Sequence, residues 1–160
     1  MKRFINFFFL FITSASFAQT ANFSGKYVLD KAKTDFGQAP QWIIPKAIEV
    51  KQGKDSVRFT RVGLDTQMNE HPYTETLPFD GEAITTNVAF TQSQRTSSLV
   101  WTADKQSFTL KIDGSRDGAP ISSATEEWSL LDGGKLLLVD RHVVMPNGFS
   151  YENKGYYDRQ

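Results

Sequence analysis

Apolar and polar residues alternate with a period of two along almost the whole chain after residue 22, and this pattern limits the folds open to it. Val57 and Phe59 alternate with Arg58 and Thr60, and later segments repeat the alternation. Successive side chains of a β-strand point to opposite faces of a sheet, so the pattern predicts strands with one buried face. Thr, Val, Phe, Tyr and Trp are concentrated in these runs, which suits half-buried strands.

Turn signals separate the runs at short intervals, among them Asp113-Gly114, Asp132-Gly133 and Asn147-Gly148. Such pairs favour tight hairpins because they accept positive φ angles. Strands joined by short links must be antiparallel neighbours, since a parallel pair needs a long crossover. We predict about ten strands. They span residues 23–29, 46–52, 55–62, 72–78, 82–90, 95–102, 106–113, 121–130, 135–145 and 149–158.

An antiparallel up-and-down meander of this kind predicts an all-β fold of one domain. A sheet with so many strands twists, and closing it into a barrel removes its exposed edges. We favour a closed or nearly closed barrel over a sandwich of two sheets. A barrel of about 8–10 strands has room inside for side chains or for one small ligand.

The first 18 residues have the order of a secretory signal peptide. Lys2 and Arg3 are basic, an apolar run follows over 4–12, and Ser16-Phe17-Ala18 resembles a cleavage site. The alternative is an N-terminal membrane anchor, for which the run is short. We expect cleavage before Gln19, an exported protein that is periplasmic or secreted, a single domain over 19–160, and no membrane span after signal removal.

The composition excludes several classes of function. Eighteen basic and eighteen acidic side chains balance, which argues against a nucleic-acid-binding protein. The absence of cysteine excludes disulfides, thiolate zinc sites and cysteine nucleophiles. The chain has no phosphate-binding loop and no metal-ligand spacing, so we expect no metal and no cofactor. No motif identifies a partner protein.

Few residues suggest catalysis. Asp140 and His142 are two apart on one predicted strand and therefore share a face. With a nearby hydroxyl they could form a nucleophile system, but no serine elbow is present. We interpret both as ordinary strand residues and His71 as a solvated loop residue. Glu126 and Glu127 are adjacent and should face opposite sides of their strand.

Aromatic side chains give the strongest hint of a binding site. Some of them line a cavity if the barrel is hollow, and otherwise they fill its core. The candidate ligand-binding residues are Trp42, Phe59, Tyr73, Phe90, Trp101, Phe108, Trp128 and Tyr151. Trp42 lies in a long irregular segment, residues 30–45, which we expect to fold over one barrel end. Trp42 would insert there, either as a fixed plug or as a lid over a ligand.

Several short motifs carry a resemblance to a known family. They are the opening segment Phe23-Ser24-Gly25-Lys26-Tyr27-Val28-Leu29-Asp30, with Lys33-Thr34-Asp35-Phe36 after it, then Phe79-Asp80-Gly81, Trp128-Ser129-Leu130 and the closing Tyr156-Tyr157-Asp158-Arg159. Together they resemble exported bacterial lipocalin-like proteins of unknown function. The resemblance implies a lipocalin-like, calycin-type β-barrel.

The wider lipocalin superfamily also implies how the barrel closes. A Gly-x-Trp motif lies near the closed end, and an Arg of the last strand covers the Trp. By this resemblance Gly25, Tyr27 and Arg159 would form the closure, with Tyr27 in place of Trp. An Arg over an aromatic ring is a favourable cation–π contact.

Three functions remain open. We favour an exported barrel that binds a small apolar or amphipathic ligand. The alternative is a structural or protein-interaction module with a filled core and no ligand. The third is an enzyme of unrecognised type that uses the strand of Asp140 and His142. A large cavity lined by aromatics favours the first, and a filled barrel favours the second.

Overall fold

The computed structural model describes residues 20–160. The predicted signal peptide, residues 1–18, and its cleavage site lie outside the described residues. The all-β prediction is confirmed: ten strands appear, each within three residues of its predicted ends. They are β1 (Gly25–Leu29), β2 (Ala47–Gln52), β3 (Ser56–Leu64), β4 (Glu70–Pro78), β5 (Ile84–Val88), β6 (Ser93–Trp101), β7 (Ser107–Arg116), β8 (Ala119–Leu131), β9 (Leu136–Val144) and β10 (Ser150–Arg159), with three short 3-10 turns, η1 (Gln41–Ile43), η2 (Ala89–Thr91) and η3 (Asp132–Gly134).

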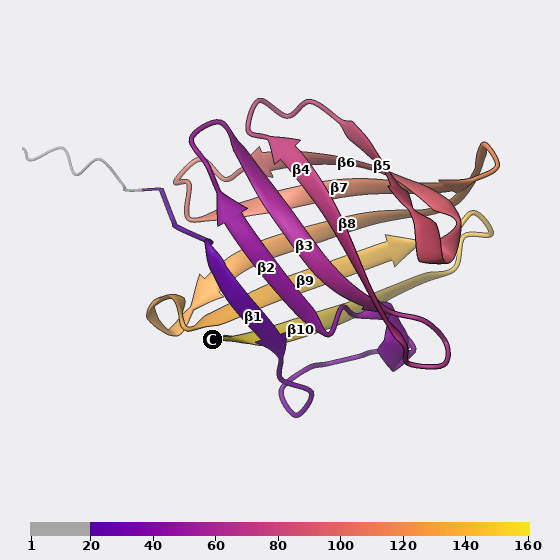
Figure 1. Ribbon diagram of the computed structural model, residues 1–160, viewed down its shortest axis with the longest axis horizontal. Coiled ribbons are helices and arrows are strands. Elements are labelled where there is room, and N and C mark those ends of the chain that lie inside the picture. Colours follow the sequence, from indigo (N-terminus) through magenta and orange to yellow (C-terminus); the bar gives the residue numbers. More distant parts are fainter. Residues whose placement is uncertain (1–19) are drawn as a thin grey trace, which may run out of the picture.

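The strands form one antiparallel sheet that curls into a nearly closed barrel. The order across the sheet is β4-β3-β2-β1-β10-β9-β8-β7-β6-β5, so β1 pairs with β10 and the two edges are β4 and β5. In Figure 1, β1 to β4 cross in front of β6 to β10. The predicted antiparallel meander is therefore confirmed. The barrel remains open between β4 and β5, which are not hydrogen-bonded neighbours in the sheet.

One predicted turn is wrong. Asp113-Gly114 does not end its strand: β7 continues to Arg116, and the ladder with β8 has an irregularity between Gly114 and Ser115. A Cβ on Gly114 would lie 2.7 Å from the Ser122 hydroxyl oxygen, so glycine permits a close approach of the strands. The turn lies at Asp117-Gly118, where both φ angles are positive.

The barrel has two distinct ends. We call one the closed end: it carries the β2–β3, β4–β5, β6–β7 and β8–β9 connections and the C-terminus. Residues 20–24 run across it, where the Ala21 amide donates to the Lys105 carbonyl at 2.9 Å. We call the other end the mouth: it carries the β1–β2, β3–β4, β5–β6, β7–β8 and β9–β10 connections.

Aromatic rings fill the interior near the closed end. Phe23, Phe59, Phe108 and Trp128 are buried and pack against one another, with ring centroids 4.6 Å apart for Phe23–Phe108 and 5.0 Å for Phe59–Trp128. Burying each such ring stabilises the fold by roughly 1.5–3 kcal/mol. This half of the barrel is therefore solid.

The three residues singled out by the resemblance lie together at the closed end. Tyr27 and Arg159 are opposite each other on β1 and β10, and the guanidinium carbon lies 5.7 Å from the Tyr27 ring centroid. A Cβ on Gly25 would come within 2.8 Å of Arg159 Nε, so glycine leaves the space that the guanidinium occupies. Arg159 also donates to the carbonyls of Ser24 and Gly134. Burial raises the pKa of the Tyr27 hydroxyl, with Arg159 acting in the opposite direction.

Candidate functional site

The predicted aromatic set divides between the two halves of the barrel. Phe59, Phe108 and Trp128 belong to the packed core, and Trp101 lies partly exposed at its edge. Tyr73, Phe90 and Tyr151 are half-buried towards the mouth. The first group fills the barrel, and only the second is placed to meet a molecule that enters at the mouth.

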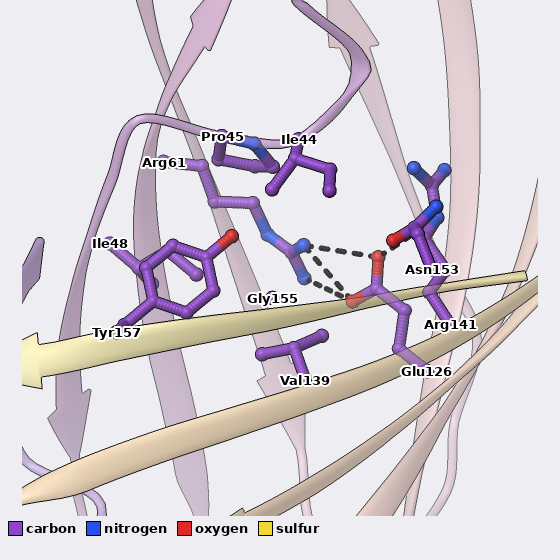
Figure 2. A pocket seen from close by; sticks show the side chains of 10 residues that line it. All are labelled: Ile44, Pro45, Ile48, Arg61, Glu126, Val139, Arg141, Asn153, Gly155 and Tyr157. Atoms are coloured by element: carbon purple, nitrogen blue, oxygen red, sulfur yellow. Dashed lines mark hydrogen bonds and ion pairs between the residues drawn. The ribbon is translucent and has the colours of Figure 1, made fainter. Parts of the chain in front are cut away.

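Trp42 does not insert into the barrel, which corrects the expectation from the sequence. It lies in η1 with 37% of its surface exposed, whereas Ile44 is only 3% exposed. The segment does fold over the mouth, but Ile44 and Pro45 are the residues that point into the interior (Figure 2). The backbone becomes extended at Ile44, directly after the 3-10 turn, which directs Ile44 inward and leaves the Trp42 ring outside.

The candidate catalytic residues are not in the barrel. Asp140 and His142 do share a face of β9, as predicted, but it is the outer face. Lys154 lies 2.7 Å from Asp140, and Glu152 lies 3.3 Å from His142 Nδ1. These are exposed cross-strand pairs, which contribute little to stability.

His71 differs from its expected role as a solvated loop residue. It lies within β4, its ring stacks on Phe90 with centroids 4.9 Å apart, and its Nε2 is 3.0 Å from Asp65. Hydrogen bonds from His71 and Asn69 hold the pKa of Asp65 below its usual range. Phe90 also approaches Gly63, so this stack packs β3 and β4 against the segment after β5.

The interior midway along the barrel holds a cluster of charged side chains that was not expected from the sequence. We call it the charge cluster. Its members come from five strands and are largely removed from water. They are Arg61 of β3, Glu75 of β4, Arg95 of β6, Glu126 of β8 and Arg141 of β9.

Glu126 lies at the centre of the charge cluster. Arg61 Nη1 and Nη2 each donate to Glu126 Oε2 at 3.0 Å, and the Trp128 indole N–H donates to the same oxygen at 3.1 Å. Arg95 Nη2 and Arg141 Nε lie 3.7 and 3.5 Å from Glu126 Oε1. The carboxylate is thus surrounded by three guanidinium groups.

Arg61 joins the two carboxylates. Its Nη2 lies 3.2 Å from Glu75 Oε1, and Arg95 Nε donates to the other Glu75 oxygen at 3.2 Å. The Arg61 guanidinium also lies 5.1 Å from the Trp128 ring centroid, so the charge cluster rests on the aromatic core. A buried charge is tolerated only when it is paired and hydrogen-bonded in this way.

Burial and charge act in opposite directions on these groups. Burial by itself would raise the pKa of Glu126, but the surrounding guanidinium groups lower it to about 2. Burial would lower the pKa of Arg61, whereas the carboxylate of Glu126 contributes most to raising it above its usual value. Burial raises the pKa of the adjacent Tyr157 hydroxyl. Arg61 and Glu126 are therefore both ionised near neutral pH.

The charge cluster is not fully hydrogen-bonded within the described part of the chain. Arg61 Nε, Arg95 Nη2, Arg141 Nε and Asn153 Nδ2 are buried donors with no hydrogen-bond partner there. Arg61, Arg141 and Asn153 border a cavity of about 10 Å³ beneath Ile44 and Pro45 (Figure 2). That is room for about one water molecule. The cavity at the charge cluster is therefore far smaller than a ligand pocket, which usually encloses roughly 300–1,000 Å³.

The alternation of inward and outward residues along the strands could have indicated this cluster from the sequence. Arg61 continues the inward series of Val57 and Phe59, and Glu126 stands two residues before the buried Trp128. Charged residues at inward positions of a strand are expensive to bury, which makes them conspicuous. What the sequence could not show is that strands far apart in the chain bring opposite charges together.

The segment over the cluster, residues 36–45, is attached by few polar contacts. We call it the mouth segment. Its hydrogen bonds in the described structure are internal or go to the adjacent Asp35: Ala39 to Phe36, Ile43 to Pro40 and Gly37 to Asp35. Its neighbours on both sides are fixed, since Asp35 pairs with Lys154 and Lys46 bonds to Val62. The mouth segment thus rests on the barrel mainly through apolar contact.

The outer surface has open hollows rather than enclosed cavities. One of them, about 580 Å³, lies at the closed end beside Phe79 and Trp101. Within residues 20–160, no group of His, Asp and Glu side chains is arranged to hold a metal ion, and no helix could cross a membrane.

Comparison with known proteins adds no further constraint. The sequence matches no family model and no curated protein.

Proposed function

We propose that the protein is an exported lipocalin-like binding protein that takes up a small amphipathic molecule through the mouth of its barrel. The observation that carries the proposal is the charge cluster, with its unpartnered donors, directly beneath a segment attached by few polar contacts.

A buried ion cluster is weak evidence of stabilisation. Replacing such groups by well-packed apolar residues is often neutral or stabilising, because desolvation offsets the attraction between charges. Buried side chains with strongly perturbed pKa values, as Arg61 and Glu126 have, are instead concentrated at functional sites. Polar donors below and half-buried aromatic rings such as Tyr73 and Phe90 above would suit a ligand with one polar end and one apolar end.

The ligand would need more space than the 10 Å³ beneath Ile44 and Pro45. Ligand pockets usually enclose roughly 300–1,000 Å³. We propose that displacing the mouth segment provides this space. The segment would then act as a lid, with Ile44 rather than Trp42 as its inward residue.

The second candidate is a structural or protein-interaction module. It is favoured by the packed core and the small interior cavity. An exposed apolar residue at either end of the barrel, Val100 at the closed end or Phe149 at the mouth, would then contribute to a contact surface.

Native mass spectrometry of protein purified from its own cell envelope distinguishes the two candidates. If the protein binds a ligand, its mass should exceed that of the polypeptide, and extraction with organic solvent should remove the excess. Binding also predicts that the stripped protein regains this mass from an envelope extract. Protein that carries no added mass, and acquires none from the extract, would contradict binding and leave the structural module.

A further inference from the structure

We infer that the ligand carries a single negatively charged oxygen group, which Arg141 and Asn153 hold at the floor of the mouth. The inference rests on the proposed binding function and names the chemistry that its site selects.

The formal charge of the cluster points to a monoanion. Three guanidinium groups face two carboxylates, so one positive charge is left uncompensated. One negative charge on the ligand would complete the balance in a site where an unpaired charge is costly. A dianion would leave an excess negative charge beside Glu126, and a cation would add to the excess positive charge.

Arg141 is the arginine best placed to receive this group. Its Nε lies 3.5 Å from Glu126 Oε1. Its terminal nitrogens make no hydrogen bond within residues 20–160, and no ion pair there with a residue other than Glu126. Its side chain is 17% exposed, compared with 2% for Arg61, so it lies on the solvent side of the cluster. Arginine presents two parallel N–H groups that match a carboxylate or sulfonate.

Asn153 provides the second donor. It is opposite Arg141 in the β9–β10 ladder, so both side chains point into the barrel. Asn153 is 4% exposed, and its Nδ2 has no hydrogen-bond partner in the described part of the chain. A buried amide nitrogen left unpaired is costly, and a ligand oxygen would satisfy it.

Arg61, Arg141 and Asn153 border the cavity, and each has a buried donor nitrogen without a hydrogen-bond partner in residues 20–160. Glu75 Oε1 is a buried acceptor without such a partner, but Glu75 does not line this cavity. Both carboxylate oxygens of Glu126 already accept hydrogen bonds, Oε1 from Arg61 and Oε2 from Arg61 and Trp128. A site of this kind accepts a ligand atom that offers lone pairs and no proton.

Calorimetric titration of the stripped protein tests the inference with probes that share one alkyl chain. Decanoate, decanol and decyl phosphate are compared below their aggregation concentrations at pH 8. Decanoate should bind about tenfold or more tightly than decanol, because a charge-assisted hydrogen bond is added. Decyl phosphate, largely a dianion at this pH, should bind less tightly than decanoate.

Two substitutions locate the site. Arg141→Met should remove the preference for decanoate over decanol, and Asn153→Ala should reduce it. Arg58→Met is the matched control, because Arg58 is exposed on the outer face of β3. The comparison of probes on the unaltered protein needs no variant, so it stands even if Arg141→Met fails to fold.

Equal binding of decanoate and decanol, tighter binding of decyl phosphate, or an Arg141→Met variant that keeps the preference would overturn the inference while leaving the binding function intact. If neither decanoate nor decanol binds and the protein also fails to regain mass from an envelope extract, the binding function itself fails.

Discussion

Glu126 and Glu127 show how completely one position along a strand changes the role of a side chain. Glu126 points inward and is buried among guanidinium groups, whereas Glu127 points outward and is exposed. Removing one partner of a buried charge network leaves the other charges uncompensated and typically costs about 3–5 kcal/mol. The same substitution at these two adjacent positions therefore compares a buried charge with an exposed one.

We expect Glu126→Gln to lower the free energy of unfolding by about 3–5 kcal/mol and Glu127→Gln to change it by less than about 0.5 kcal/mol. Urea denaturation of both variants measures the difference. Similar effects at the two positions would show that the interior charges contribute nothing particular to stability.

The pH dependence follows from the same residue. The pKa of Glu126 is about 2 in the folded protein, below its value in an unfolded chain. A lowered folded pKa contributes stability that is complete above the unfolded pKa and is lost as the pH falls through the folded pKa. The stability of the unaltered protein should therefore decline between about pH 5 and pH 2. Glu126→Gln should lose less over the same interval, which urea denaturation at each pH would record.

Arg159 is the residue whose removal tests the closure. Arg159→Ala loses a cation–π contact with Tyr27 and two hydrogen bonds to backbone carbonyls. Because Arg159 is exposed, we expect a loss of about 1–2 kcal/mol, seen as a lower melting temperature by calorimetry. Arg58→Ala, on the outer face of β3, should leave the melting temperature unchanged. A wild-type melting temperature for Arg159→Ala would mean that the closure depends on strand pairing alone.

At the scale of elements, the mouth segment contains residues that differ sharply in burial. Ile44 is buried and Trp42 is exposed, although both lie on the same short connection. Ile44→Ala should lower the free energy of unfolding by about 2 kcal/mol or more, and Trp42→Ala by less than about 1 kcal/mol. Chemical denaturation provides the comparison, and the reverse order would restore Trp42 as the plug.

The two edge strands are the other distinctive elements. Ladders join every consecutive pair in the sheet order, but β4 and β5 are its two ends. Backbone amides at an unpaired edge open more easily than those held between two neighbours. Hydrogen exchange should therefore be faster in β5 and along the free edge of β4 than in β8 and β9. Equal protection would indicate that the barrel is fully closed in solution.

At the scale of the whole molecule, the proposal of export depends on the residues that precede the barrel in the sequence. The basic residues, apolar run and small residues before Gln19 predict cleavage there. N-terminal sequencing of the protein recovered outside the cytoplasm should begin at Gln19. Recovery with Met1 in place would contradict the export proposal.

The class and course of the fold follow from local properties of the chain. Alternation sets which face of each strand is buried, and short turns require antiparallel neighbours, so all ten strands could be placed from the sequence. The misplaced turn at Asp113-Gly114 marks the limit of local reasoning, because the glycine serves contact with Ser122 on the next strand.

The contents of the interior, in contrast, depend on how the sheet closes. Arg61 and Glu126 are separated by 65 residues, and only closure of the sheet places them 3.0 Å apart. The sequence showed charged residues at inward positions but not their partners, because pairing depends on barrel curvature and on which strands face each other. The side chain over the cluster is Ile44 rather than Trp42, because the extended backbone that follows η1 directs Ile44 inward. That cluster lies beneath Ile44 only in the closed sheet.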